Sequence, residues 1–170
     1  MEAICYKRFS ASATPTLSLL IKSVKFYGKI GAVIGKVTEE RIRVRYGETD
    51  QMGHAYYANY LYWFEQARGA WCRAHGFTYK ELEAMGYKLP VVEVFAKYRN
   101  EVRYDDEIIV RVSLEEVCRS SLRFAYTIWN ESTNKLTTEG YTWHVLMGES
   151  RRAIAIPETV KALLMSEPKL

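Results

Sequence analysis

The stretch that decides the expected fold is residues 58–75, ANYLYWFEQARGAWCRAH, which has the pattern of a buried helix. It contains no proline, and one stripe of apolar side chains recurs at intervals of three or four residues. The members of this stripe are Leu61, Phe64, Ala67, Trp71 and Ala74. Tyr60 and Trp63 make other sides apolar too, so we expect the helix to be buried on most of its circumference. It would be about 27 Å long, with Asn59 placed to cap its start and Gly76 to end it.

Period-two alternation predicts strands on both sides of this helix. Residues 41–46, RIRVRY, precede it, and four later segments alternate in the same way. Their apolar positions are Val92, Val94, Ala96 and Tyr98, then Ile108, Val110, Val112 and Leu114, then Leu122, Phe124, Tyr126 and Ile128, and finally the run 136–147. Residues 152–156 would add a further short strand. Because successive strands are joined by tight loops, we expect an antiparallel sheet.

Two short helices complete the expected fold. Thr78 to Gly86 has the form of a capped helix, with Thr78 as its cap and Glu81 as the capping-box partner. Pro157 begins a C-terminal helix at the first helical position. The sequence therefore predicts an α+β fold in which an antiparallel sheet of five or six strands wraps around one long central helix. An open sheet edge is normally covered by a second copy, so we also expect an oligomer.

Length and composition indicate an ordinary globular domain. The chain has 170 residues, of which 48% are hydrophobic and 26% charged, and no run reaches the roughly 18 apolar residues of a membrane-spanning helix. Its three cysteines are far apart and form no C-x-x-C pair, so a disulfide framework and a cysteine zinc site are not expected. The expected location is the cytoplasm, because a reducing compartment suits this cysteine usage best.

The positive charge is concentrated at the N-terminus. Residues 1–38 carry six Lys or Arg against Glu2, a net charge of +5, whereas residues 39–170 have a net charge of −1. We therefore divide the chain into a basic N-terminal extension, residues 1–37, expected to be poorly ordered, and a folded domain, residues 38–170. The extension is also similar to an organelle transit peptide, so organelle targeting is the alternative. A nearly neutral domain does not indicate nucleic-acid binding.

The loop that leads into the central helix, Asp50-Gln-Met-Gly-His-Ala-Tyr-Tyr-Ala-Asn-Tyr60, holds the candidate chemistry. The first N–H groups of a helix have no intrahelical acceptor, and they can stabilise an oxyanion formed on a carbonyl group. A nearby carboxylate such as Asp50 can attack that carbon or activate a water. Gly53 would let a substrate approach the backbone. The alternative is that Asp50 closes an Asx turn and His54 lies in solvent.

The stretch from Tyr46 to Glu65, YGETDQMGHAYYANYLYWFE, resembles the signature of the 4-hydroxybenzoyl-CoA thioesterase family. It is similar above all to the acyl-CoA thioesterase branch associated with the Tol–Pal system. The likeness continues through Lys97-Tyr-Arg-Asn, Tyr104-Asp-Asp-Glu and Arg119-Ser-Ser, and it covers about residues 38–165. This resemblance implies the hotdog fold, dimers or tetramers with sites at subunit interfaces, and hydrolysis of acyl-CoA thioesters without a metal.

Carried over to this chain, the resemblance implies a catalytic role for three residues. Asp50 aligns with the catalytic aspartate, acting as nucleophile or general base. Tyr57 aligns with the position whose backbone N–H polarises the thioester carbonyl. His54 matches a histidine of this branch and could orient Asp50 or a water. Tyr57 stands where this branch often has a second histidine, so the resemblance does not extend to a mechanism that needs that histidine.

Other residues are candidates for the substrate-binding surface, together with Gly53. Glu65 is also the rival catalytic carboxylate, because another hotdog class uses a glutamate of the helix; alternatively it pairs with Arg68 at i,i+3. Arg119, Ser120 and Ser121 could bind the phosphates or pantetheine of coenzyme A, or could form a polar strand connection. No paired-histidine or H-E-x-x-H spacing indicates a metal site.

The expected function is therefore hydrolysis of an acyl-CoA thioester to a free acid and coenzyme A. No cofactor is expected, since coenzyme A is part of the substrate, and acyl-carrier protein is a possible alternative partner. A homodimer or homotetramer is expected, with no nucleic acid and no transmembrane segment. The first alternative is a non-catalytic hotdog module that binds acyl-CoA or acyl-carrier protein, and the second is a hydratase or dehydratase of the same fold.

Overall fold

The computed structural model describes residues 34–168 of the chain. Its elements are β1 (Ile34–Arg43), η1 (Tyr46–Glu48), α2 (Asn59–Ala74), α3 (Tyr79–Ala84), β2 (Val91–Tyr98), β3 (Glu107–Val117), β4 (Ser121–Asn130), β5 (Lys135–Val145) and α4 (Glu158–Leu164). Most of the expected N-terminal extension lies outside the described residues. No helix in the described range is both long enough and apolar enough to span a membrane.

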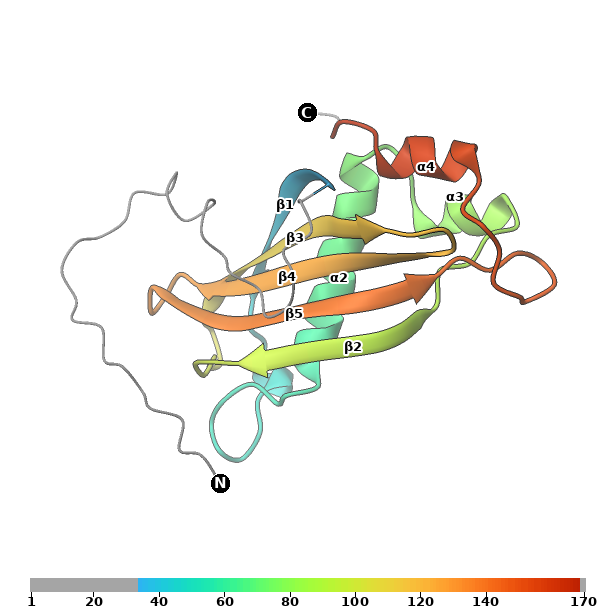
Figure 1. Cartoon of the computed structure of the whole chain (residues 1–170). Helices are drawn as coiled ribbons and strands as arrows, with labels where there is room; N and C mark the ends of the chain where they lie inside the picture. The colour runs from blue at the N-terminus through green and yellow to red at the C-terminus, as the bar shows by residue number, and fades with distance from the viewer. Residues whose placement is uncertain (1–33, 169–170) are drawn as a thin grey trace, which may run out of the picture. The chain divides into compact units, whose positions relative to one another are not determined.

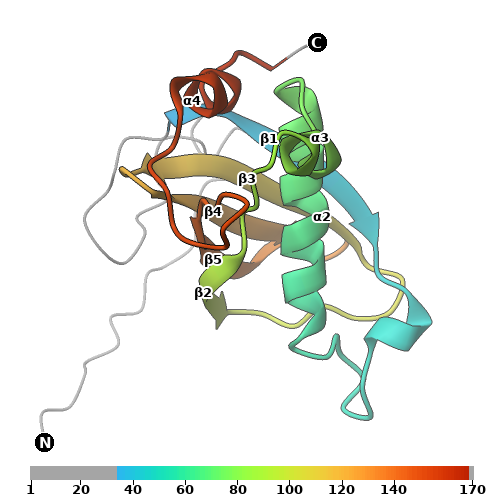
Figure 2. The same ribbon diagram turned by 90° about the vertical axis from the view of Figure 1, so that its right-hand side faces the viewer.

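The five strands form one antiparallel sheet in the order β1-β3-β4-β5-β2, and α2 packs against one face (Figure 1). Figure 2 shows the sheet curving around the helix. This is the arrangement of the hotdog fold, as the resemblance implies. The strand faces predicted from alternation in β3 and β4 form the core. Ile108, Val110, Val112, Leu114, Leu122, Phe124, Tyr126 and Ile128 are all buried.

The central helix begins differently from the expectation. Ala58 occupies the N-cap position without a side-chain cap, and Asn59 is the first helical residue. The side-chain amide of Asn59 instead donates to the carbonyl oxygen of Glu48 at 2.6 Å. The predicted capping role of Asn59 is therefore wrong, because a tertiary acceptor takes its amide. The C-terminal end is as predicted: Gly76 has φ +84° and donates to Arg73, and Phe77 donates to Cys72, as in a Schellman motif.

The helix is also less enclosed than expected. Trp63, Phe64, Ala67 and Trp71 are buried, but Leu61, Tyr62 and Glu65 are exposed. The reason is geometric, because a single sheet covers only the side of the helix that faces it. One face of α2 is therefore open within a single chain.

Three smaller expectations also need correction. β1 ends at Arg43, and Tyr46 already belongs to the short helix η1. Residues 152–156 form no strand; Ala153 makes an isolated bridge to Met147. Pro157 is the N-cap of α4, one position before the first helical residue. By contrast, α3 has the predicted capping box, in which Glu81 N donates to Thr78 Oγ1 at 3.2 Å and Thr78 N to Glu81 Oε2 at 2.7 Å.

Candidate active site

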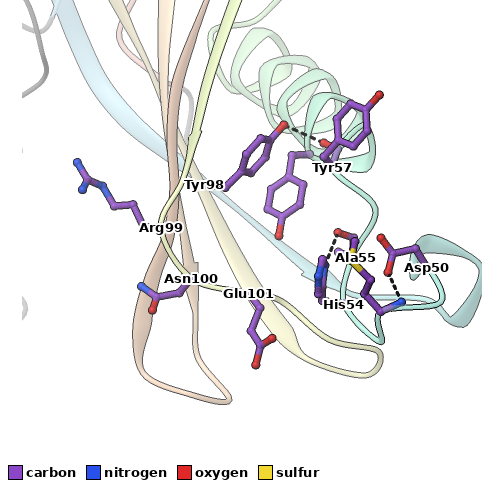
Figure 3. A pocket seen from close by; sticks show the side chains of 10 residues that line it. Asp50, His54, Ala55, Tyr57, Tyr98, Arg99, Asn100 and Glu101 are labelled. Carbon is purple, nitrogen blue, oxygen red and sulfur yellow. Dashed lines mark hydrogen bonds between the residues drawn. The ribbon is translucent and has the colours of Figure 1, made fainter.

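A cavity of about 350 Å³ lies between the loop that precedes α2 and the end of β2 (Figure 3). The loop and the first turn of α2 provide Asp50, Met52, His54, Ala55, Tyr57 and Tyr60. The end of β2 and the segment after it provide Tyr98, Arg99, Asn100 and Glu101. The structure thus brings the three residues predicted to be catalytic, Asp50, His54 and Tyr57, to the wall of one cavity.

The loop owes its shape to a tight turn from Asp50 to Gly53. Gly53 N donates to Asp50 O at 3.0 Å, and Asp50 N donates to His54 O at 3.0 Å. Gly53 has φ +81°, which favours glycine, whereas a Cβ atom there would meet nothing within 4 Å. It is exposed and does not line the cavity. The turn, and not clearance for a substrate, therefore explains this glycine.

The carboxylate of Asp50 has one oxygen bonded within the turn and one oxygen without a bond. Its Oδ1 accepts a hydrogen bond from Met52 N at 2.8 Å, so it does close an Asx turn (Figure 3). Its Oδ2 has no hydrogen-bond donor among residues 34–168. The turn fixes the orientation of the carboxylate while one oxygen stays available to a molecule in the cavity.

Tyr57 precedes α2 by two residues, and its carbonyl oxygen is hydrogen-bonded whereas its N–H is not. The Tyr98 hydroxyl donates to its carbonyl oxygen at 3.0 Å. Tyr56 N donates to Glu48 O at 2.9 Å and Asn59 N to Tyr56 O at 2.9 Å, whereas Ala58 N has no acceptor among residues 34–168. Within the described part of the chain, the N–H of Tyr57 has no acceptor. It is therefore a free donor one residue before the N-cap of a long helix.

Aromatic rings form the inner wall of the cavity. Tyr60 is buried and packs edge-on against Tyr98, with ring centroids 4.8 Å apart. Burial raises the pKa of Tyr60 to about 12, and Tyr98 and the carboxylates of Asp106 and Glu101 act in the same direction. The Tyr60 hydroxyl is therefore neutral at physiological pH, and this wall adds no charge to the cavity.

His54 is half-buried beside Asp50 without a hydrogen bond between the two side chains in the described structure. Its Nδ1 lies 3.4 Å from the carbonyl oxygen of Ala55. The two residues are joined through the backbone, from Asp50 N to His54 O. This bond uses the backbone of His54 alone, so the imidazole does not orient Asp50 in this structure, and its ring lines the cavity as a separate polar group.

The wall provided by the end of β2 was not among the predicted site residues. Asn100 Nδ2 donates to Leu136 O at 2.7 Å, and Arg99 forms an ion pair with Glu139, so both side chains anchor this segment to β5. Lys97-Tyr-Arg-Asn belongs to the part of the sequence that resembles the thioesterase family, so the resemblance contained a signal for this segment. Strand periodicity, however, does not show which loop the end of a strand will face.

Glu65 does not belong to this cavity. It is exposed on the open face of α2 and is not among the lining residues. The alternative pairing with Arg68 is wrong, because Arg68 points into the core. Arg68 Nε donates to the Tyr79 hydroxyl at 2.7 Å and Nη1 to the Tyr126 hydroxyl at 3.3 Å.

Arg119, Ser120 and Ser121 lie away from the cavity within one chain. Arg119 and Ser120 lie in the turn between β3 and β4, and Ser121 is the first residue of β4, seven positions before Ile128. Ile128 and Tyr98 both pair with Thr138, so they are level with each other across the sheet. At about 3.3 Å per residue this separation is about 23 Å. A single chain therefore does not bring these residues to Asp50.

The arrangement suits attack on a carbonyl group. Asp50 and Tyr57 line the same cavity; the first has a half-free carboxylate, able to activate a nucleophile, and the second a free N–H, able to stabilise an oxyanion. Among residues 34–168, no group of three His, Cys, Asp or Glu side chains is placed to hold a metal ion.

Comparisons with known proteins identify the family of this chain. Residues 44–164 match the model of the family described as the thioesterase-like superfamily. The acyl-CoA thioester hydrolase YbgC of Escherichia coli O6:H1 is 28% identical over 122 residues, which cover 71% of this chain and 90% of that protein.

Two solved structures have the same fold at substantial identity. A hypothetical protein from Thermus thermophilus is 36% identical, with a TM-score of 0.70, over 74% of this chain and 95% of that one. A DHNA-CoA thioesterase from Staphylococcus aureus is 31% identical, with a TM-score of 0.67, over 71% of this chain and 80% of that one.

Proposed function

The chain belongs to the thioesterase-like superfamily, and we propose that it hydrolyses an acyl-CoA thioester to a carboxylic acid and coenzyme A. The observation that carries this proposal is the pairing of two unengaged groups in one cavity. These groups are the Oδ2 atom of Asp50 and the backbone N–H of Tyr57. The acyl-CoA thioester hydrolase and the DHNA-CoA thioesterase described above support thioester chemistry for this fold.

In the first form of the mechanism, Asp50 acts as a general base. Its carboxylate takes a proton from water, and the resulting hydroxide attacks the thioester carbonyl carbon. The carbonyl oxygen becomes an oxyanion, which accepts a hydrogen bond from Tyr57 N–H. When the carbonyl reforms, the carbon–sulfur bond breaks and the proton passes from Asp50 to the departing thiolate.

In the second form, Asp50 is the nucleophile. Its carboxylate attacks the carbonyl carbon, the thiolate leaves, and a mixed anhydride joins the acyl group to Asp50. Water then hydrolyses the anhydride and restores the carboxylate. The two forms differ in where the oxygen of water ends up. After a single turnover in ¹⁸O-water, the nucleophilic route can leave label in the Asp50 carboxylate, whereas the general-base route places it in the acid product.

The decisive experiment measures release of free coenzyme A from a panel of short, long and aromatic acyl-CoA substrates. We expect turnover by the wild-type protein and a loss of kcat of about a hundredfold or more in Asp50→Asn, with unchanged thermal stability. Wild-type turnover in Asp50→Asn would remove Asp50 from the mechanism. Binding of every acyl-CoA without hydrolysis would favour the non-catalytic module.

We also propose that the active form is an oligomer in which the β2 edges of two chains face each other. β2 is the last strand of the sheet, and Val92, Val94 and Phe95 on it are exposed. A second copy would cover these side chains. It would also supply Arg119, Ser120 and Ser121 to the neighbouring cavity, where they would bind the phosphates or pantetheine of coenzyme A. Light scattering measures the molar mass of the wild-type protein and of Val94→Arg. We expect the mass of an oligomer for the wild type and a lower mass for the variant.

A further inference from the structure

Glu48, which sequence analysis did not single out, is a buried carboxylate two residues before Asp50. It lies in η1 and is 7% exposed. We propose that Glu48 is a positioning residue that holds Asp50 and the Tyr57 N–H in their reactive arrangement. This inference rests on the proposed function, because it concerns the geometry of that same site.

The carboxylate of Glu48 joins the end of β1 to the interior side of α2. Its Oε2 accepts from Arg45 N at 2.7 Å, and its Oε1 accepts from Arg45 Nη2 at 3.0 Å. Oε1 also accepts from the indole N–H of Trp63 at 3.2 Å. Trp63 is fully buried in the core and therefore rigid, so Glu48 is held against a fixed part of the helix.

The carbonyl oxygen of the same residue holds the other side of the site. It accepts from Tyr56 N at 2.9 Å and from Asn59 Nδ2 at 2.6 Å. These two residues flank Tyr57 and Ala58. One buried residue therefore contacts the segment on both sides of the free N–H, while its own chain continues directly to Asp50.

The protonation state of Glu48 suits this role. Burial opposes the charged form, but the hydrogen bonds from Arg45 and Trp63 outweigh it and lower the pKa of Glu48 below its usual value. The residue is thus an anion surrounded by donors. Glutamine has the same shape, but its amide NH₂ would face a donor whichever way it is turned, because both carboxylate oxygens accept hydrogen bonds.

The test is the Glu48→Gln variant of the full chain, assayed with the acyl-CoA that the wild type hydrolyses best. Misplacement of the reacting groups lowers kcat more than it weakens substrate binding. We expect kcat to fall about tenfold or more and KM to stay within about twofold. The amide of Tyr56, measured by NMR hydrogen exchange, should exchange about tenfold faster, because its acceptor is Glu48 O.

Glu115→Gln is the matched control. Glu115 is also 7% exposed and pairs with an arginine, Arg123, at 2.9 Å, but it lies in β3 and does not line the cavity. This variant should retain the wild-type kcat and the wild-type exchange rate of Tyr56. If Glu48→Gln does not fold, Asn59→Ala, which removes one donor to Glu48 O, should lower kcat in the same way.

The outcomes separate this inference from the proposed function. Wild-type kcat and Tyr56 exchange in a folded Glu48→Gln overturn the positioning role, as does an equal loss in Glu115→Gln. If wild-type protein hydrolyses no thioester, the proposed function fails. The exchange rate of Tyr56 then decides by itself whether Glu48 holds this segment.

Discussion

The hydroxyl of Tyr98 donates a 3.0 Å hydrogen bond to the carbonyl oxygen of Tyr57. This bond joins the last residue of β2 to the segment that enters α2, across 41 positions of the chain. This bond limits rotation about the Cα–C bond of Tyr57, while the bond from Asn59 N to Tyr56 O holds the peptide plane that carries the Tyr57 N–H. β2 therefore contributes to the proposed oxyanion donor although it carries no reacting group.

We expect Tyr98→Phe to lower kcat about fivefold, because losing one hydrogen bond costs about 1 kcal/mol. The ring would remain against Tyr60, so KM should change little. Steady-state kinetics of acyl-CoA hydrolysis measure both constants. Tyr62→Phe is the control, since Tyr62 is exposed on α2 and its hydroxyl has no hydrogen-bond partner in the described structure. Equal kcat values in the two variants would contradict the positioning of Tyr57 by Tyr98.

Arg119→Ala should distinguish a coenzyme A contact from a plain strand connection. If the guanidinium binds a phosphate, loss of a charged hydrogen bond of about 2 kcal/mol should raise KM for acyl-CoA by roughly tenfold or more. An acyl-N-acetylcysteamine thioester lacks the nucleotide, so its KM should not change. Lys80→Ala, which removes an exposed cation on α3, is the control. Parallel changes with both substrates would argue against a phosphate contact.

We expect the free energy of unfolding to fall as the pH drops from about 6.5 to 4. His144 is fully buried, with Nε2 2.9 Å from Thr142 Oγ1. Burial, assisted by the Arg68 guanidinium, lowers the pKa of His144 to about 4, although a hydrogen bond with the Leu89 carbonyl opposes the shift. The unfolded chain therefore binds a proton that the folded chain does not. Across this window His144 alone should remove about 3 kcal/mol.

Urea unfolding at pH 7, 6 and 5 measures this effect, with His144→Gln for comparison. The variant loses the titrating group, so its free energy of unfolding should depend less steeply on pH than that of the wild type. Equal slopes in the two proteins would show that other groups cause the acid sensitivity.

Gly140→Ala should destabilise the fold. Gly140 lies in β5 where the Phe64 ring of α2 packs against the sheet, and a Cβ atom there would lie 2.9 Å from that ring and even closer to the carbonyl oxygen of Phe95. Overpacking of this kind costs about 1–3 kcal/mol. Gly47→Ala is the control, because a Cβ atom at residue 47 meets nothing within 4 Å. Thermal unfolding should show a lower Tm for the first variant and little change for the second.

Local sequence patterns predicted the core well, because the spacing of apolar residues along a strand or helix directly reflects which side is buried. The alternating apolar residues of β3 and β4 are buried, and the capping box at Thr78 and the turn at Gly76 lie where their residue types indicate. The same patterns misplaced Asn59 and Arg68. In both cases a tertiary partner competes successfully with the local one: the Glu48 carbonyl for Asn59 and two buried tyrosine hydroxyls for Arg68.

The sequence by itself determined that a long apolar helix lies on an antiparallel sheet and that Asp50 and Tyr57 stand just before that helix. Both features depend on residues that are close together in the sequence, so the periodicity and spacing of those residues predict them. The tertiary structure alone decided that Tyr98 and Glu48 hold the Tyr57 segment and that Arg119 lies at the other end of the sheet. Such contacts depend on which strand end meets which loop, and that follows from strand order and register, which no local pattern encodes.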